Sequence, residues 1–316
     1  MNCSKYNNNN DNQLYNVHNN EITKGNVNSV KRLTQLINYH FNSIFREKYY
    51  ASSPTNFKYI IPTGGINNVV SIKLLSVEIP NSWFLFSNII GNNKFKIETT
   101  YKNKCSVHHI IIPEGNYDRE SLVNYLNKKY FVESGVDILE NIEIGIDEYT
   151  NKTYFKLSDS APEDFVFSLH FVEDEQTNII KTLGWNLGFR LSKYLNITDI
   201  IQSEGLFDGG GDRYVYLVFN DYNYNTNPNN IVCFDNTSMD DNILAKIQLL
   251  NGKFSLNFNE NDSNPLIKIR KYNAPVNINK IEIKLLDKFG NFIDLNNMDW
   301  SFSIEFEILY QNILFK

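Results

Sequence analysis

Cysteine is scarce in this sequence. The 316 residues include only three, Cys3, Cys105 and Cys233. An odd number of cysteines at unrelated spacings argues against a disulfide framework, and the spacings are not those of a zinc site. We therefore expect reduced thiols that behave as small hydrophobic side chains, in a protein made in a reducing, cytosol-like compartment.

Long hydrophobic runs and basic runs are absent as well. No stretch approaches the ~18 consecutive apolar residues of a membrane helix, and the Asn-rich beginning has no apolar segment of the signal-peptide type. The formal net charge is −6, and the lysines and arginines are too scattered to follow a phosphate backbone. We expect no transmembrane segment, no secretory route and no direct contact with nucleic acid.

The motifs of common enzymes are missing too. The sequence contains no Gly-x-Ser-x-Gly nucleophile motif. The adjacent residues His108 and His109 would point to opposite faces of a strand, so they could not hold one metal ion together. Acidic pairs such as Glu260 and Asp262 lie in polar stretches typical of solvated loops. We predict no enzymatic activity and no cofactor, while an enzyme of an unrecognised class stays open as an alternative.

A glycine-rich segment from Ser203 to Arg213 is the most conspicuous candidate for a ligand site. A phosphate-binding loop would lead into a helix, whereas this segment leads into a predicted strand. Asp208 and Asp212 are secondary candidates for metal binding, but the closing Glu of a calcium loop is absent. We interpret the segment as a loop whose glycines permit positive φ. Neutralising either aspartate should then leave the fold and the assembly largely intact.

Aromatic residues are abundant, with 22 Phe and 19 Tyr, and this composition favours strands. Alternation of apolar and polar residues predicts strands at 69–79, 214–219, 281–285 and 302–308. Strands at short intervals with turns between them are typical of a sandwich or jelly roll. We therefore predict a mainly β protein, an antiparallel jelly-roll-like β-sandwich that contains all four strands, with one or two short inserted helices.

Local signals add further elements to this plan. A hairpin is predicted from 142–146 and 153–157, and a helix at 118–130 begins at Asp118, which can cap it. We expect this helix to pack on the outside or end of the sandwich. A weaker helical stretch covers 174–182. The Asn251-Gly252 pair predicts a second hairpin, whose strands would be residues 244–249 and 254–258.

The N-terminal region divides into two parts. Residues 1–28 contain eleven Asn and no periodic apolar pattern, so we expect a disordered arm. Residues 29–55 are predicted to be an amphipathic helix, at 29–45, and a linker. Residues 56–316 would form the β-sandwich core, with a helical insertion near 118–190. The apolar stripe of the helix is the predicted interaction surface, made of Leu33, Leu36, Ile37, Phe41 and Ile44.

About residues 45–310 contain ordered blocks that resemble virion structural proteins of nucleocytoplasmic large DNA viruses, the mimivirus-like and phycodnavirus-like groups. The blocks are Phe45-Arg46-Glu47-Lys48-Tyr49-Tyr50, residues 53–57, 67–74 and 77–83, Ile111-Ile112-Pro113-Glu114-Gly115-Asn116-Tyr117, and Leu183-Gly184-Trp185-Asn186-Leu187-Gly188-Phe189-Arg190.

The resemblance implies a minor capsid or penton-type protein with a jelly-roll-like core and no catalytic residues. Its expected partners are other capsid proteins, namely the major capsid protein and neighbouring minor capsid subunits, and a homo-oligomer is expected. The expected location is the virion, assembled in the host cytoplasm. The alternative is a carbohydrate-binding or host-attachment β-sandwich module of the virion surface, because aromatic side chains on a β face can stack on sugars.

Overall fold

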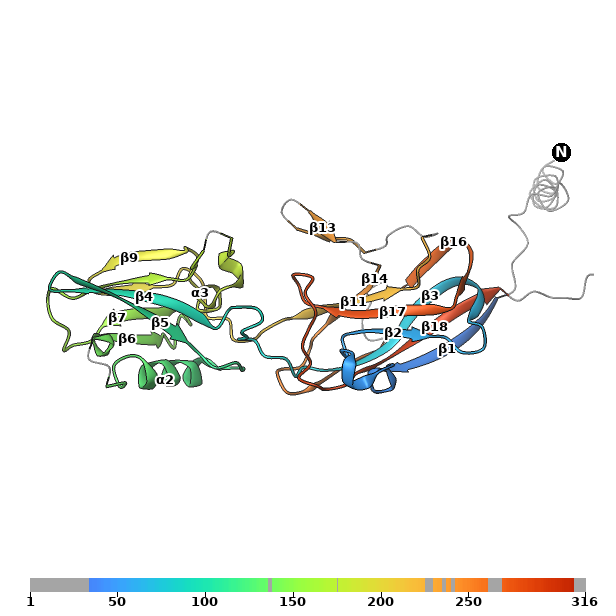
Figure 1. Ribbon diagram of the computed structural model, residues 1–316, viewed down its shortest axis with the longest axis horizontal. Helices are drawn as coiled ribbons and strands as arrows, with labels where there is room; N and C mark the ends of the chain where they lie inside the picture. The colour runs from blue at the N-terminus through green and yellow to red at the C-terminus, as the bar shows by residue number, and fades with distance from the viewer. Residues whose placement is uncertain are drawn as a thin grey trace, which may run out of the picture.

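A computed structural model describes residues 34–135, 138–174, 176–224, 230–234, 237–239, 242–260 and 269–309. The predicted arm at 1–28 and the candidate interaction residue Leu33 lie outside the described residues. Figure 1 shows two lobes side by side along the long axis of the molecule. We call them the sandwich lobe, residues 34–83 and 212–309, and the inserted lobe, residues 84–211. None of the described helices is long and apolar enough to cross a membrane.

The sandwich lobe contains two main sheets. One has the order β1-β18-β3-β15, with β16 beside β3, and the other has the order β14-β11-β17-β2. The strands are β1 Thr34–Asn42, β2 Asn56–Ile60, β3 Ile66–Pro80, β11 Tyr214–Asn220, β14 Ile243–Gln248, β15 Leu256–Glu260, β16 Ile269–Ile278, β17 Lys280–Leu286 and β18 Ser301–Leu309, with a small hairpin of β12 Val232–Cys233 and β13 Ser238–Met239 between β11 and β14.

The pairing of these strands is nested. Leaving the small hairpin aside and counting β15 and β16 as one strand position, the first strand pairs with the eighth and the second with the seventh. The third pairs with the sixth and the fourth with the fifth. One long antiparallel ribbon is thus folded over on itself, which is a jelly roll. The predicted fold class is confirmed, and the four predicted strands lie in one sandwich as β3, β11, β17 and β18.

Alternating side chains build the core between the two sheets. On β18, Phe302, Ile304 and Phe306 are buried, whereas the residues between them are half-exposed. Phe302 stacks on Trp300 with ring centroids 4.9 Å apart, and on Phe41 of β1 at 5.0 Å. Each such side chain contributes roughly 1.5–3 kcal/mol by leaving water. The period of two in the sequence therefore reports directly which face of the strand is buried.

The inserted lobe has a core of its own. Its sheets have the orders β5-β4-β8-β9 and β10-β7-β6. Its elements are β4 Lys94–Tyr101, β5 Lys104–Ile111, α2 Arg119–Lys129, β6 Ile142–Ile146, β7 Thr153–Leu157, β8 Val166–His170, α3 Leu183–Asn186, β9 Lys193–Ile197 and β10 Ile200–Gln202. Among the described residues, 3-10 turns occur at η2 Ser43–Phe45 and η3 Tyr49–Ala51 in the sandwich lobe, and at η4 Leu139–Asn141 and η5 Ile179–Lys181 in the inserted lobe.

Several local predictions for the inserted lobe are confirmed. The hairpin of β6 and β7 has the predicted bounds. Helix α2 begins after Asp118, whose side chain accepts a hydrogen bond from the Ser121 amide. Its buried residues Leu122 and Leu126 belong to the core of the inserted lobe. The prediction that this helix packs on the sandwich is therefore wrong, and the insertion is wider than 118–190 because it includes β4 and β5.

The predicted helix at 29–45 is wrong where the structure describes it, because residues 34–42 form strand β1. All nine residues of β1 pair with β18. Phe41 is buried in the core, whereas Leu36 is 58% exposed and Ile44 is 49% exposed. Ile37 is half-buried. The supposed helical stripe is thus spread over two strand faces and a turn, because pairing with β18 outweighs a short helical period.

The predicted hairpin at Asn251-Gly252 is also wrong. Strand β14 pairs with β11 in one sheet, and β15 pairs with β3 in the other. Residues 249–255 therefore carry the chain across the sandwich. Asn251 supports this crossing, since its side-chain amide donates to the Leu256 carbonyl over 2.7 Å. A local turn signal could not reveal that each flanking strand has a better partner elsewhere.

A buried ion pair ties β16 to the end of β11. The Arg270 guanidinium donates to the Phe219 carbonyl over 2.7 Å and to Asp221 Oδ1 over 3.3 Å. Asp221 also accepts a hydrogen bond from the Tyr272 hydroxyl. The side chains of Asp221 and Arg270 are 0% and 6% exposed. This pair connects the two sheets through charge inside the sandwich lobe.

We predict that Asp221→Asn lowers the free energy of unfolding by about 3–5 kcal/mol, because it leaves the Arg270 charge buried without a counterion. Urea unfolding measures this loss. The control is Lys58→Ala. The Lys58 side chain is 64% exposed and pairs with Glu282 at the surface, so its removal should cost under about 1 kcal/mol. Equal losses in the two variants would contradict the prediction.

Candidate functional site

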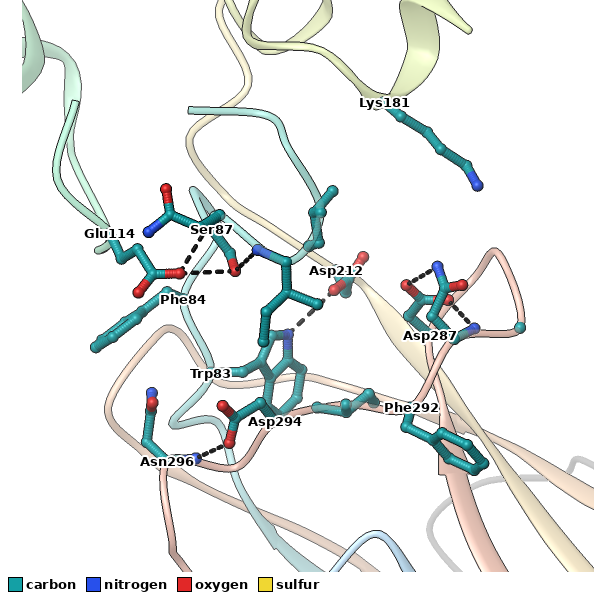
Figure 2. Close-up of a pocket in the computed structure, with 16 residues that line it drawn as sticks. Trp83, Phe84, Ser87, Glu114, Lys181, Asp212, Asp287, Phe292, Asp294 and Asn296 are labelled. Atoms are coloured by element: carbon teal, nitrogen blue, oxygen red, sulfur yellow. Dashed lines mark hydrogen bonds between the residues drawn. The ribbon is translucent and has the colours of Figure 1, made fainter. Parts of the chain in front are cut away.

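A cavity of about 690 Å³ lies at the junction of the two lobes. Figure 2 shows side chains from both lobes around it. Glu114 and Lys181 come from the inserted lobe. Trp83, Asp212 and Asp287 come from the sandwich lobe and the segments that leave and enter it. The cavity is therefore created by the way the lobes are joined.

The outgoing crossing, after β3, is held by Asn116. The Leu85 amide donates to its Oδ1 over 2.7 Å, and its Nδ2 donates to the Trp83 carbonyl over 3.4 Å. Phe86 and Gly115 exchange two backbone hydrogen bonds, of 3.1 and 3.0 Å. Two of the sequence blocks, at 77–83 and 111–117, thus meet at this crossing. Their residues position one wall of the cavity.

The return crossing is the segment that leads from the inserted lobe back to β11. It is held by hydrogen bonds between Asn186, at the end of α3, and Asp208. The Asp208 amide donates to the Asn186 carbonyl over 2.8 Å, and Asn186 Nδ2 donates to the Asp208 carbonyl over 3.2 Å. Asp208 Oδ1 accepts from the Gly210 amide over 3.1 Å. The side chain of Asp208 therefore caps its own turn and does not line the cavity.

Asp212 has a different role from Asp208. Its Oδ2 accepts a hydrogen bond from Trp83 Nε1 over 3.1 Å, and its Oδ1 lies 3.7 Å from Lys288 Nζ. The glycine-rich segment is a loop that brings this carboxylate onto Trp83. The described residues contain no group of three metal-ligating side chains, so the two candidate metal ligands are not joined in such a cluster.

Lys253 lies against the same tryptophan. Its Nζ donates to the Trp83 carbonyl over 3.2 Å and lies 4.5 Å from the centre of the ring. Burial lowers the pKa of Lys253 to about 8, and the Asp212 carboxylate opposes this shift. Trp83 belongs to one of the sequence blocks and Asp212 to the glycine-rich segment, but no pattern in the sequence pointed to Lys253. No local signal connects residues so far apart in the chain.

The other acids of the cavity hold turns. Asp287 Oδ1 accepts from the Phe289 and Asn291 amides, each over 2.8 Å. Glu114 Oε1 accepts from the Asn88 amide over 2.8 Å. Asp294 caps the turn at Asn296 in the same way, as Figure 2 shows. These carboxylates serve as hydrogen-bond acceptors for the backbone, an arrangement that suits structure and binding better than acid–base chemistry.

A second feature is an exposed aromatic loop, residues 43–51, which directly follows β1. Phe45 is 79% exposed and Tyr50 is 100% exposed. The loop is nevertheless held firmly, because Arg46 donates to Asp299 Oδ1 over 2.7 Å and to the Ser43 carbonyl over 2.8 Å. The guanidinium also lies 4.0 Å from the centre of the Tyr49 ring. The first of the sequence blocks therefore forms a rigid surface loop.

Comparison with known proteins finds no relative of high sequence identity. No protein-family model matches the chain, and no curated protein matches it. Among solved structures, the mavirus penton protein is similar, with 9% sequence identity, coverage of 86% of this chain and 99% of that chain, and a TM-score of 0.44. At this identity and TM-score, the function has to be argued from the residues of this chain.

We predict that the stability of the protein rises between pH 8 and pH 10.5 through Lys253. Below pH 8 the lysine is charged in both the folded and unfolded states, so the cost of burying its charge is fully present. Above pH 8 the folded protein releases this proton while the unfolded chain keeps it, up to the ordinary pKa of 10.5. The gain is up to about 3 kcal/mol.

Lys253→Met should remove this part of the pH dependence and raise stability at pH 7. Urea unfolding from pH 6.5 to 10.5 measures both effects, with Lys58→Met as the exposed control. If the free energy of unfolding varied with pH in the same way in the wild type and in Lys253→Met, burial of the charged lysine would not destabilise the folded protein, and the prediction would be wrong.

A further prediction separates the two aspartates. Asp212→Asn should cost about 1 kcal/mol, because it removes the negative charge beside Lys253 and Lys288. Asp208→Asn should change stability by less than about 0.5 kcal/mol, because it retains a side-chain oxygen to accept from Gly210. Added calcium should leave the melting temperatures of the wild type and of both variants unchanged. A calcium-dependent rise in the wild type that these variants lack would instead establish a metal site.

Proposed function

We propose that this chain is a structural component of a large DNA virus capsid, a minor capsid or penton-type protein, which acts by packing against other proteins. The observation that carries the proposal is the aromatic loop, which is exposed and yet rigidly held. Contiguous apolar patches on a surface mark sites of interaction, and Ile44, Phe45 and Tyr50 are all exposed within this one loop. A loop that is already ordered loses little conformational entropy on binding, so it suits a permanent contact.

The fold and the sequence blocks support the same proposal. Jelly rolls occur in viral capsid proteins and also in lectins, so the fold alone does not decide between them. The blocks that resemble virion proteins include the aromatic loop and the two segments that meet at Asn116. They therefore coincide with the exposed loop and with the joint between the lobes, the two features that would determine how a subunit fits its neighbours.

The proposed partners are the major capsid protein, neighbouring minor capsid subunits and further copies of this chain, within a virion assembled in the host cytoplasm. Direct contact with nucleic acid, a cofactor and catalysis are not part of the proposal. The arm at residues 1–28 is proposed to add little to the stability of the core. Among the described members of the predicted interaction stripe, Leu36 and Ile44 are exposed.

The carbohydrate-binding alternative has less support. It would be favoured by a row of exposed aromatic side chains on one sheet face. Among the described residues, the most exposed aromatics are Phe45, Tyr50, Tyr149 and Tyr224, and none of the four lies in a strand. An enzyme would be favoured by convergent acids in a pocket, but those at the lobe junction are bound to backbone amides and to Trp83.

We predict that Phe45→Ala combined with Tyr50→Ala leaves the melting temperature within about 2 °C of the wild type, because both side chains are largely in water. The same variant should lose at least about tenfold in incorporation into purified particles, measured by quantitative mass spectrometry. Tyr149→Ala is the matched control, since Tyr149 is 95% exposed in the inserted lobe. Normal incorporation of the double variant would exclude the aromatic loop as the assembly contact. Absence of the wild-type chain from particles would exclude the capsid role.

A further inference from the structure

Strand β1 forms one edge of the β1-β18-β3 sheet, and one of its sides is open. Its other side pairs with β18 along all nine residues, from Thr34 with Leu309 to Asn42 with Ser301, without a register shift. Within the described part of the chain, no strand pairs with the open side. Every second residue of β1 therefore directs its backbone N–H and C=O groups away from the sheet, where they can pair with another strand.

The sequence of β1 does not protect this edge. It reads Thr-Gln-Leu-Ile-Asn-Tyr-His-Phe-Asn, with no lysine, arginine, acidic residue or proline. Proteins usually guard exposed edges with charges, prolines, bulges, short strands or a covering helix. Most other sheet edges of the two lobes, as far as they are described, have such features: Lys58 on β2, Lys246 on β14, Lys271 and Pro275 on β16, Lys104 on β5, Lys193 on β9, a length of three residues for β10, and contact with α2 for β6. The opposite edge of the same sheet, β15, is only five residues long, against nine for β1.

We propose that β1 pairs antiparallel with β1 of a second copy of this chain, about a twofold axis at Asn38, so that one sheet continues across two molecules. The proposal rests on the self-association part of the proposed function and specifies its contact. It does not require that the assembly be a capsid.

The alternation of β1 favours this register. Ile37, Tyr39 and Phe41 face the core side of the sheet and are half-buried or buried, whereas Leu36 and Asn38 face outward. Residues directly opposite in an antiparallel pair lie on the same face. A twofold axis at Asn38 places Ile37 opposite Tyr39, so the core sides of the two sheets coincide. Because Asn38 is the central residue of the strand, all nine residues find a partner.

The neutrality of β1 favours a second copy as the partner. A twofold axis places each residue opposite its symmetry mate, so a charged edge would bring like charges together and oppose the pairing. Here Asn38 faces Asn38, and Leu36, which is 58% exposed, faces His40. The pairing covers an apolar side chain, satisfies open backbone groups and brings no like charges together at neutral pH.

The register provides a sharp test, because residue 38 is predicted to face itself. The full-length chain should show a concentration-dependent dimer by light scattering after size-exclusion chromatography. Asn38→Lys alone and Asn38→Asp alone should each weaken the dimer by about fivefold, the factor that corresponds to ~1 kcal/mol for a like-charged cross-strand pair. Mixing the two variants should restore wild-type affinity or exceed it, because lysine then faces aspartate. Asn38→Gln is the neutral control and should leave the dimer unchanged.

Other results would overturn the proposal in recognisable ways. A monomeric wild-type chain at all concentrations would mean that β1 is covered by its own chain or by a different protein. A dimer that persists unchanged in Asn38→Lys would place the contact elsewhere. A weakened dimer that mixing fails to restore would rule out this register. A chain that dimerises as predicted but never enters particles would leave this inference standing and remove only the capsid role.

Discussion

The nested antiparallel pairing of the sandwich lobe is the constraint on which the rest of the structure depends. Strands far apart in the sequence are partners, from β1 with β18 to β11 with β14, so the two halves of the lobe form one folded ribbon. Only this pairing brings the apolar faces of the two sheets together over a common core. It also places the start of the described chain beside its end, with Phe41 packed on Phe302.

The inserted lobe follows from the same ribbon. It interrupts the ribbon between β3 and β11, and both crossings must therefore pass through one narrow joint. Asn116 and Asn186 secure these crossings by hydrogen bonds to the backbone, while Trp83 is held by Asp212 and Lys253. The cavity at the joint is lined by carboxylates because the turns on either side of it need acceptors for their amides. The acidic residues around this cavity thus serve mainly to accept hydrogen bonds from the backbone amides of the turns.

The surface of the sandwich lobe is uneven in a way that suits assembly. The aromatic loop is anchored by the Arg46–Asp299 pair, whose side chains are 5% and 20% exposed. This anchor holds the loop in place, so its apolar side chains stay exposed to solvent. The adjoining strand β1 leaves a neutral edge of nine residues open, while most of the other edges carry charge or proline, are covered, or are shorter. Exposed apolar side chains and an open strand edge thus occur together at this end of the sandwich.

Local patterns in the sequence determined much of the protein. The period of two located the strands β17 and β18, because alternation follows from burial of one face and needs no knowledge of the partner. The strands β3 and β11 were predicted as well, and β11 is a nearly continuous apolar run that is buried on both faces. Asp118 marked the start of α2 for the same local reason. The loop character of the glycine-rich segment was also predictable, since the segment leads into a strand and not into a helix. Fold class and the absence of familiar catalytic motifs were therefore within reach of the sequence.

Only the tertiary structure decided which strands pair and which residues meet. Residues 34–42 show apolar residues at spacings that suit a helix, yet they form a strand because β18 offers nine residues of pairing. Asn251-Gly252 has the composition of a hairpin turn, yet its flanking strands belong to different sheets. Trp83, Asp212 and Lys253 meet only because the lobe between β3 and β11 brings the crossings together. Local propensity is worth little per residue compared with long-range pairing and burial, and those contacts leave no trace in neighbouring positions of the chain.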